Sequence, residues 1–173
     1  MTQNNNSNNV NIDLARLAKR HFPTNGGPIP PIVTAEAAIL TWLSSKHGID
    51  ISGYYDGVHH IQQADGAILQ IDVMLADEAS FGEEYIVETI LGRITHLYRS
   101  VFDNSGLKKG ILFIIVKDYI SLTQISNELE TRHQQYRTSF TYTPPDIQII
   151  FGEIITGRFT PKNEVEAAKT LLG

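Results

Sequence analysis

The fold is decided by residues 53–75, which read GYYDGVHHIQQADGAILQIDVML. Two runs rich in apolar and β-branched residues are separated by a short polar segment that contains Asp65-Gly66. An Asp-Gly pair between two such runs is typical of a β-hairpin, because both residues accept the positive φ angles of a tight turn. We therefore expect two antiparallel strands, over 51–62 and 67–75, joined by this turn.

The segments that follow the hairpin alternate between helical and strand patterns. Between 82 and 102 apolar residues recur at spacings of three and four, which predicts a long amphipathic helix. Residues 110–116 and 147–151 are continuous apolar runs, typical of strands that are buried on both faces. Together with helices expected over 35–47, 122–136 and 161–172, this order predicts an α/β fold whose mixed central sheet carries helices on both faces.

By composition the chain divides into three parts. Residues 1–11 form an Asn-rich tail that we expect to be disordered, since it has too little apolar area to offset the entropy of ordering. Residues 12–33 combine a short amphipathic helix with a linker rich in Pro and Gly. Residues 34–173 are expected to form a single α/β domain, with Thr34 as the N-cap of its first helix and Pro161 at the start of its last.

The composition also narrows the classes of function. The 173 residues include no cysteine, which rules out disulfides, thiolate catalysis and cysteine-bound zinc. No apolar run reaches the ~18 residues of a membrane span and no signal peptide is recognisable, so we expect a cytoplasmic protein without a membrane partner. A net charge of −5 argues against a protein that mainly coats nucleic acid. Between Lys46 and Arg93 there are nine acidic residues and no Lys or Arg, which suits either a cation site or a solvated acidic face.

Each expected hairpin strand carries an aspartate, Asp56 on the first and Asp72 on the second. If the strands pair through the predicted turn, side-chain alternation lets the two carboxylates converge. Like charges held together need a cation or a proton, and oxygen ligands favour Mg²⁺ or Mn²⁺. Two simpler interpretations stay open: Asp56 as a turn residue before Gly57, and Asp72 as a polar residue on an exposed sheet face.

A helix with Glu36 in its first turn, a hairpin with two aspartates, a long helix and then a buried strand together resemble the core of the PD-(D/E)XK nucleases. The resemblance covers roughly 34–151 and rests on the order of elements and the placement of acids. It implies a restriction endonuclease-like core, Asp56 and Asp72 as ligands of Mg²⁺ or Mn²⁺, Glu36 as an assisting acid, no other cofactor, and DNA as the substrate.

The chain departs from that family at one position. Where the family has an acid, any residue and then lysine, this sequence has Asp72, one residue and then Met74. In the family the lysine helps to orient the attacking water and to offset charge in the transition state, and a thioether does neither. Gln70 or His60, each on a strand face that carries one of the aspartates, is the candidate replacement donor. The basic residues nearest to Met74 in the sequence are Lys46, at the end of the preceding helix, and Arg93, in the middle of the following one.

Three interpretations of function follow. A nuclease-like domain that has lost catalysis would act as a binding, regulatory or oligomeric accessory module, with a protein, a second copy or a nucleic-acid complex as its partner. An intact site would make the chain an Mg²⁺-dependent DNA endonuclease of the restriction, resolvase or element-excision type. Without the resemblance, the chain is an α/β protein-interaction module whose aspartates are superficial.

Overall fold

The computed structural model describes most of the chain from residue 30 onward. The described residues are 12, 14, 15, 17, 30–51, 54, 60–62, 68–76, 83–103, 107–116 and 122–172. The Asn-rich tail, most of the linker, Asp56 and the predicted turn at Asp65-Gly66 lie outside them, so what the sequence predicts there stays a prediction.

A mixed sheet of five strands forms the centre of the molecule. They lie side by side in sequence order; β1 is antiparallel to β2, β2 to β4 run parallel, and β5 is antiparallel to β4. Pairing of His60 with Gln70 confirms that the predicted hairpin strands are antiparallel. The strands are β1 His60–Gln62, β2 Ile68–Leu75, β3 Leu107–Ile115, β4 Asp146–Ile155 and β5 Arg158–Pro161.

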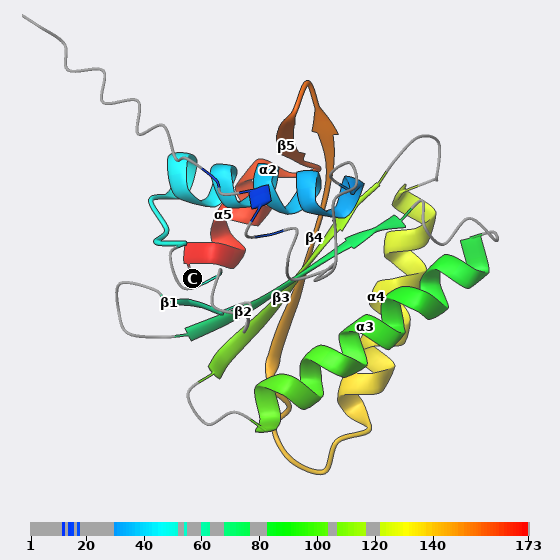
Figure 1. Ribbon diagram of the computed structural model, residues 1–173. Helices are drawn as coiled ribbons and strands as arrows, with labels where there is room; N and C mark the ends of the chain where they lie inside the picture. The colour runs from blue at the N-terminus through cyan, green and yellow to red at the C-terminus, as the bar shows by residue number, and fades with distance from the viewer. Residues whose placement is uncertain are drawn as a thin grey trace, which may run out of the picture.

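Helices cover both faces of this sheet, as Figure 1 shows. α3 (Glu83–Asp103) and α4 (Leu122–Thr138) each connect two neighbouring parallel strands, and both lie on one face. Successive right-handed crossovers in one direction along a sheet require this arrangement. α2 (Pro31–His47) and α5 (Glu164–Leu172) cover the opposite face, which confirms the predicted α/β class.

The face under α2 and α5 carries an apolar core with an aromatic centre. Phe113 of β3 meets the rings of Trp42 and Phe159 edge-on, at centroid distances of 6.1 and 5.7 Å. Trp42 and Phe159 meet in the same way at 5.0 Å. Leu17 is fully buried in this core, so a residue of the segment before the linker packs into the domain.

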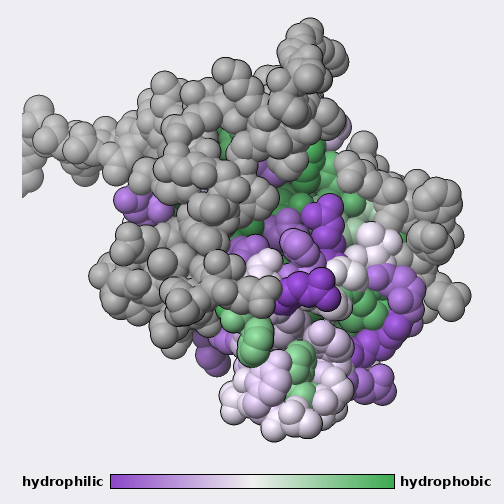
Figure 2. Space-filling model, turned by 60° about the horizontal axis from the view of Figure 1, so that its bottom comes forward, coloured by the Kyte–Doolittle hydropathy of each residue, from purple (hydrophilic) through white to green (hydrophobic). Residues whose placement is uncertain are grey.

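The face under α3 and α4 combines an apolar core with a row of aromatic rings. Neighbouring rings of this row, near the ends of both helices, lie 5.1 to 5.5 Å apart between centroids. Figure 2 views this end of the molecule, where weakly polar surface is interrupted by small apolar patches. The two outermost rings are largely exposed, Phe102 by 62% and Tyr142 by 49%. The row consists of Tyr136, Tyr98, Phe140, Tyr142 and Phe102.

The predicted starts of the first helix and of the first hairpin strand are wrong. α2 begins at Pro31 and its N-cap is Pro30, which makes no side-chain capping bond, so Thr34 lies inside the helix. A proline fits the first helical turn because its φ angle is already helical and its missing N–H has no partner there. The first hairpin strand covers His60–Gln62 within the expected range, whereas Ile51, also in that range, is buried without being part of a strand.

The hairpin between β4 and β5 does not follow from the sequence analysis. Thr156 and Gly157 at its tip both have positive φ angles, 48° and 74°, as a type I′ turn requires. Thr-Gly is a weaker turn signal than Asn-Gly or Asp-Gly. Pro161 ends β5 instead of starting the last helix, and α5 begins later, where the Asn163 side chain accepts a hydrogen bond from the Glu166 N–H at 3.2 Å.

Candidate functional site

Asp72 lies in the middle of β2 and faces α3. The Arg93 Nη1 of α3 is 3.4 Å from both of its carboxylate oxygens, and Oδ1 also accepts a hydrogen bond from the Val73 N–H at 3.0 Å. The Asp72 side chain is 14% exposed and that of Arg93 is 47% exposed. A guanidinium therefore supplies the positive charge that the sequence analysis requires beside this carboxylate.

Gln70 and Met74 share the strand face of Asp72. Met74 is buried in the apolar core under α3 and α4. Gln70 is half-buried, and its Oε1 is buried without a hydrogen-bond partner among the described residues. His60 is its register partner across the β1–β2 pair, so the two predicted replacement donors lie opposite each other on neighbouring strands.

Glu36 is not brought together with Asp72. Glu36 is buried on α2, which packs on the face formed by Leu69, Ile71 and Val73, and Asp72 points to the other face. The position of Asp56 lies outside the described residues. Among the residues that the structure does describe, no three carboxylate or imidazole side chains gather closely enough to hold a metal ion.

Arg93 is the residue of this region that sequence reasoning names without assigning a role. It directly precedes Ile94 and lies three residues after Ile90, both of which are buried in the apolar stripe of α3. A basic residue at the edge of such a stripe reaches the sheet beneath the helix with its long side chain. The position of Arg93 in the sequence therefore predicts that its side chain lies near the sheet. It does not identify Asp72, 21 residues earlier, as the partner.

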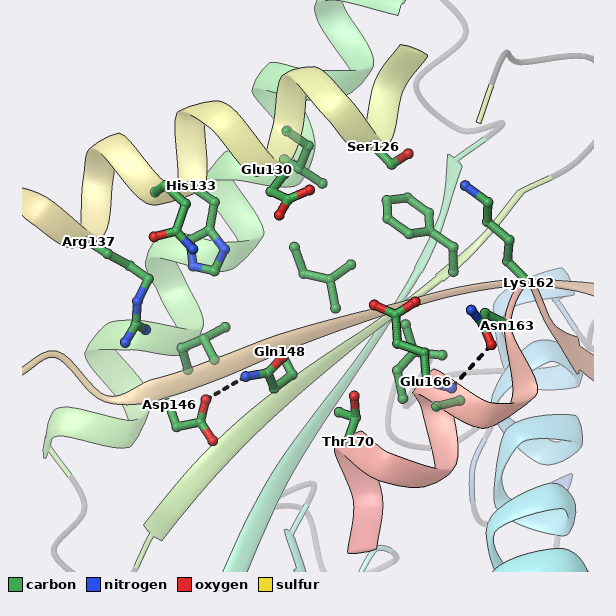
Figure 3. Close-up of a pocket in the computed structure, with 17 residues that line it drawn as sticks. Ser126, Glu130, His133, Arg137, Asp146, Gln148, Lys162, Asn163, Glu166 and Thr170 are labelled. Atoms are coloured by element: carbon green, nitrogen blue, oxygen red, sulfur yellow. Dashed lines mark hydrogen bonds between the residues drawn. The ribbon is translucent and has the colours of Figure 1, made fainter. Parts of the chain in front are cut away.

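A second candidate site lies along the outer edge of β4. β5 pairs with β4 only at Gly152 to Ile155, which leaves 146–151 without a strand on that side among the described residues. A groove of about 710 Å³ follows this stretch, between α4 and the segment 162–170 that includes most of α5. We call it the β4 groove, and Figure 3 shows the strand passing between the two helices.

Polar side chains form both walls of the β4 groove. On the α4 wall Ser126, Glu130, His133 and Arg137 recur at spacings of three and four, so they share one helix face. On the opposite wall Glu166 projects from α5, and Figure 3 shows that the carboxylates of Glu130 and Glu166 both point into the groove. Neither carboxylate forms an ion pair with a described residue.

A buried hydrogen-bond network supports the α4 wall. Arg137 Nη1 donates to the Tyr98 hydroxyl at 2.9 Å and to the Pro145 carbonyl at 2.8 Å. The Tyr98 hydroxyl is 2.6 Å from His133 Nε2, and we assign its proton to this bond, which leaves the neutral imidazole protonated at Nδ1. Burial, and then the nearby Arg137 charge, lower the pKa of His133, which agrees with a neutral ring. The network joins α3, α4 and the start of β4.

Comparison of the chain with protein-family models, with curated proteins and with solved structures finds no match. None of the helices that the structure describes is both long and apolar enough to cross a membrane.

Proposed function

We propose that this chain is a nuclease-like domain that has lost catalysis and works by binding a partner. The environment of Asp72 carries the proposal, because Arg93 contacts its carboxylate and Met74 is buried where the family has its lysine. A guanidinium that already compensates the carboxylate weakens its attraction for a divalent cation. A buried thioether neither orients a water molecule nor stabilises developing negative charge.

The order of elements supports the nuclease-like part of the proposal. Along the chain α2 is followed by β1, β2, α3 and β3, which is the order on which the resemblance rests. The position of Asp72 in the second of these strands also agrees with it.

The described residues do not fit Mg²⁺ or Mn²⁺. Such ions take several oxygen ligands, with carboxylates foremost among them. Asp72 faces Arg93, Gln70 offers one neutral oxygen, and Glu36 lies on the opposite side of the sheet. We therefore derive no metal-dependent step from this site.

The β4 groove supports the binding part of the proposal. Within the described part of the chain, it combines a stretch of strand edge that no strand covers with two carboxylates that have no ionic partner. Unpaired edges and uncompensated charges are the features with which a domain recognises another chain.

Calorimetric titration with Mn²⁺ tests the loss of catalysis. We would compare the wild type with Asp72→Asn and with Glu153→Gln, a control that removes one negative charge from an exposed position of β4. The same samples are then incubated with supercoiled and with branched DNA in Mg²⁺ or Mn²⁺. We expect the same heats from all three proteins and intact DNA throughout.

Metal binding and DNA cleavage that disappear in Asp72→Asn and persist in Glu153→Gln would contradict the proposal. They would identify the chain as a metal-dependent endonuclease instead.

A further inference from the structure

Strand β4 is longer than the strand that covers its outer edge. It has 10 residues, and β5 pairs with Gly152 to Ile155 only. Within the described part of the chain, 146–151 is bonded on one side, by β3, and has no strand on the other. This stretch reads DIQIIF, and an apolar, isoleucine-rich edge is a template for one more strand.

Two hydrogen bonds show which backbone groups point outward. The Gly152 carbonyl accepts from the Val116 N–H, next to β3, at 2.9 Å, whereas the Phe151 carbonyl accepts from the Lys162 N–H, on the outer side, at 2.8 Å. Backbone groups of successive strand residues point to alternate sides, so those of Ile147 and Ile149 point outward like that of Phe151. Each of the two residues offers one donor and one acceptor to an incoming chain.

The walls of the β4 groove select the shape of its occupant. α4 stands on one side of the strand edge and α5 on the other (Figure 3). A second copy of this chain would have to bring its own two helical walls to the same edge in order to reach the ~4.8 Å spacing of paired strands. A single extended peptide has no such walls and fits between the helices.

The lining of the groove carries charges of both signs. Its cations are Arg137, whose guanidinium is bonded within the molecule, and Lys162, directly after β5.

The carboxylates of the groove select the chemistry of the peptide. Asp146, at one end, has Lys109 within 3.8 Å, so its charge is compensated inside the molecule. Glu130 and Glu166 face the groove from opposite walls without such a partner in the described chain. A lysine or arginine side chain between them would satisfy both carboxylates.

We propose that the β4 groove binds an extended, basic peptide segment of a partner protein, which pairs with Ile147 and Ile149 as an added strand and places a cationic side chain between Glu130 and Glu166. The inference rests on the proposed binding function and names its surface and partner class. Main-chain hydrogen bonds would hold the peptide, and the two carboxylates would select its sequence.

Hydrogen exchange of the free protein tests the backbone part of this inference. The amides of Gln148 and Ile150 point to β3 and are expected to exchange slowly. Those of Ile147 and Ile149, one residue away on the same strand, are expected to exchange faster, because they point into the groove. Equal protection of all four amides would mean that the edge is already covered, and would overturn the proposal.

Peptide binding tests the chemistry. The probes are fluorescein-labelled, end-blocked peptides of alternating valine and threonine, long enough to span 146–151, each with one lysine at a different position. We expect saturable binding by fluorescence anisotropy for at least one of them, and about tenfold weaker binding by the Glu130→Gln/Glu166→Gln double variant. Glu153→Gln, whose side chain lies beyond the groove lining, is expected to bind like the wild type.

Ile149→Pro provides a second, independent variant. Proline removes the outward N–H and blocks the edge, while the pairing with β3 does not use that group. We expect peptide binding to be lost while the circular dichroism spectrum is retained. If this variant fails to fold, the double glutamine variant still decides the question, because it alters two helix side chains.

Absence of binding for every lysine peptide, or unchanged affinity in the double variant, would overturn the inference. If sedimentation shows a dimer of the wild type and a monomer of Ile149→Pro, the occupant of the β4 groove is a second copy of this chain and not a peptide of a partner protein. DNA cleavage that depends on Asp72 would remove the proposed function and leave the peptide measurement unaffected, so the two failures are distinguishable.

Discussion

Both faces of the sheet bury an aromatic cluster that contains a histidine, and the two histidines have opposite electrostatic neighbours. On the α2 face His47 lies against Trp42, with its Nε2 3.7 Å from a carboxylate oxygen of Glu164. On the α4 face His133 is bonded to Tyr98, beside the guanidinium of Arg137. Burial lowers the pKa of both rings. At His47 the Glu164 carboxylate raises the pKa and Lys46 lowers it by less, whereas at His133 Arg137 lowers it further.

This difference makes the α4 face more sensitive to acid than the α2 face, although burial lowers the histidine pKa on both. A proton on His47 gains an ion pair with Glu164. A proton on His133 adds a second cation beside Arg137 and removes the acceptor of the Tyr98 hydroxyl. Because His133 belongs to the α4 wall of the β4 groove, the acid-sensitive face is also the one that shapes the candidate binding site.

Removal of the aromatic centre of the α2 face is expected to have the largest effect. Phe113→Ala leaves a cavity between Trp42 and Phe159 and should lower the free energy of unfolding by about 3–5 kcal/mol. Phe140→Ala, in the half-exposed row of the other face, should cost about 1 kcal/mol. Urea unfolding followed by circular dichroism measures both values, and similar losses would show that the two clusters contribute equally.

Removal of a single hydroxyl tests the network of the α4 face. Tyr98→Phe leaves His133 Nε2 buried without its donor and should cost about 1–3 kcal/mol in urea unfolding. Tyr136→Phe is the matched control, since it removes a hydroxyl from an adjoining ring that forms no hydrogen bond to a described residue. A loss in Tyr98→Phe no larger than in Tyr136→Phe would show that the network adds nothing to stability.

Acidification should weaken the fold, and His133 should account for more of this loss than His47. Both folded-state pKa values lie below the ordinary 6.5, so the unfolded chain takes up these protons first as the pH falls through that value. Stability is therefore lost from about pH 6.5 downward, until the pH passes the folded-state pKa values.

Urea midpoints at a series of pH values, for the wild type, His133→Gln and His47→Gln, measure the two contributions. We expect the pH dependence to become flatter in His133→Gln than in His47→Gln, since Glu164 offsets part of the effect at His47. The opposite order would contradict the comparison of the two faces.

The ion pair of Asp72 with Arg93 should contribute least, because half of the Arg93 side chain is in contact with solvent. A double-mutant cycle with Asp72→Asn and Arg93→Gln should give a coupling of less than about 1 kcal/mol that decreases with added salt. A larger coupling that does not depend on salt would show that this ion pair stabilises the fold as much as the Tyr98 network does. The urea unfolding of the Asp72→Asn single variant in this cycle also shows directly whether that variant is folded for the metal titration.

Local patterns in the sequence were sufficient for the class of fold. Apolar residues at spacings of three and four predicted α3, which the structure places at Glu83–Asp103. Continuous apolar runs predicted β3 and β4, and the antiparallel pairing of β1 with β2 agrees with the predicted hairpin. These predictions succeeded because the hydrophobic period of a segment is a property of the segment alone.

The errors occurred where a short signal had two meanings. Thr34 is a good capping residue, but Pro31 is also suited to a helix start, and the helix begins there, four residues before the predicted start. Proline is common both at a helix start and in an edge strand. Pro161 lies in a strand because the turn at Thr156 and Gly157 brings 158–161 back along β4. Neither choice follows from local preference, since each depends on what the segment packs against.

The sequence by itself determined an α/β chain with a mixed sheet, the positions of its longest elements, and the presence of an aspartate inside the second strand. The tertiary structure decided which charges meet: Asp72 faces Arg93 across 21 residues of sequence, and Glu36 lies on the other side of the sheet. It also decided that β5 pairs with only part of β4, so that 146–151, the edge on which the binding proposal rests, has no further strand among the residues that the structure describes. Ion pairs and strand edges arise between segments that are distant in the chain, so no local pattern encodes them.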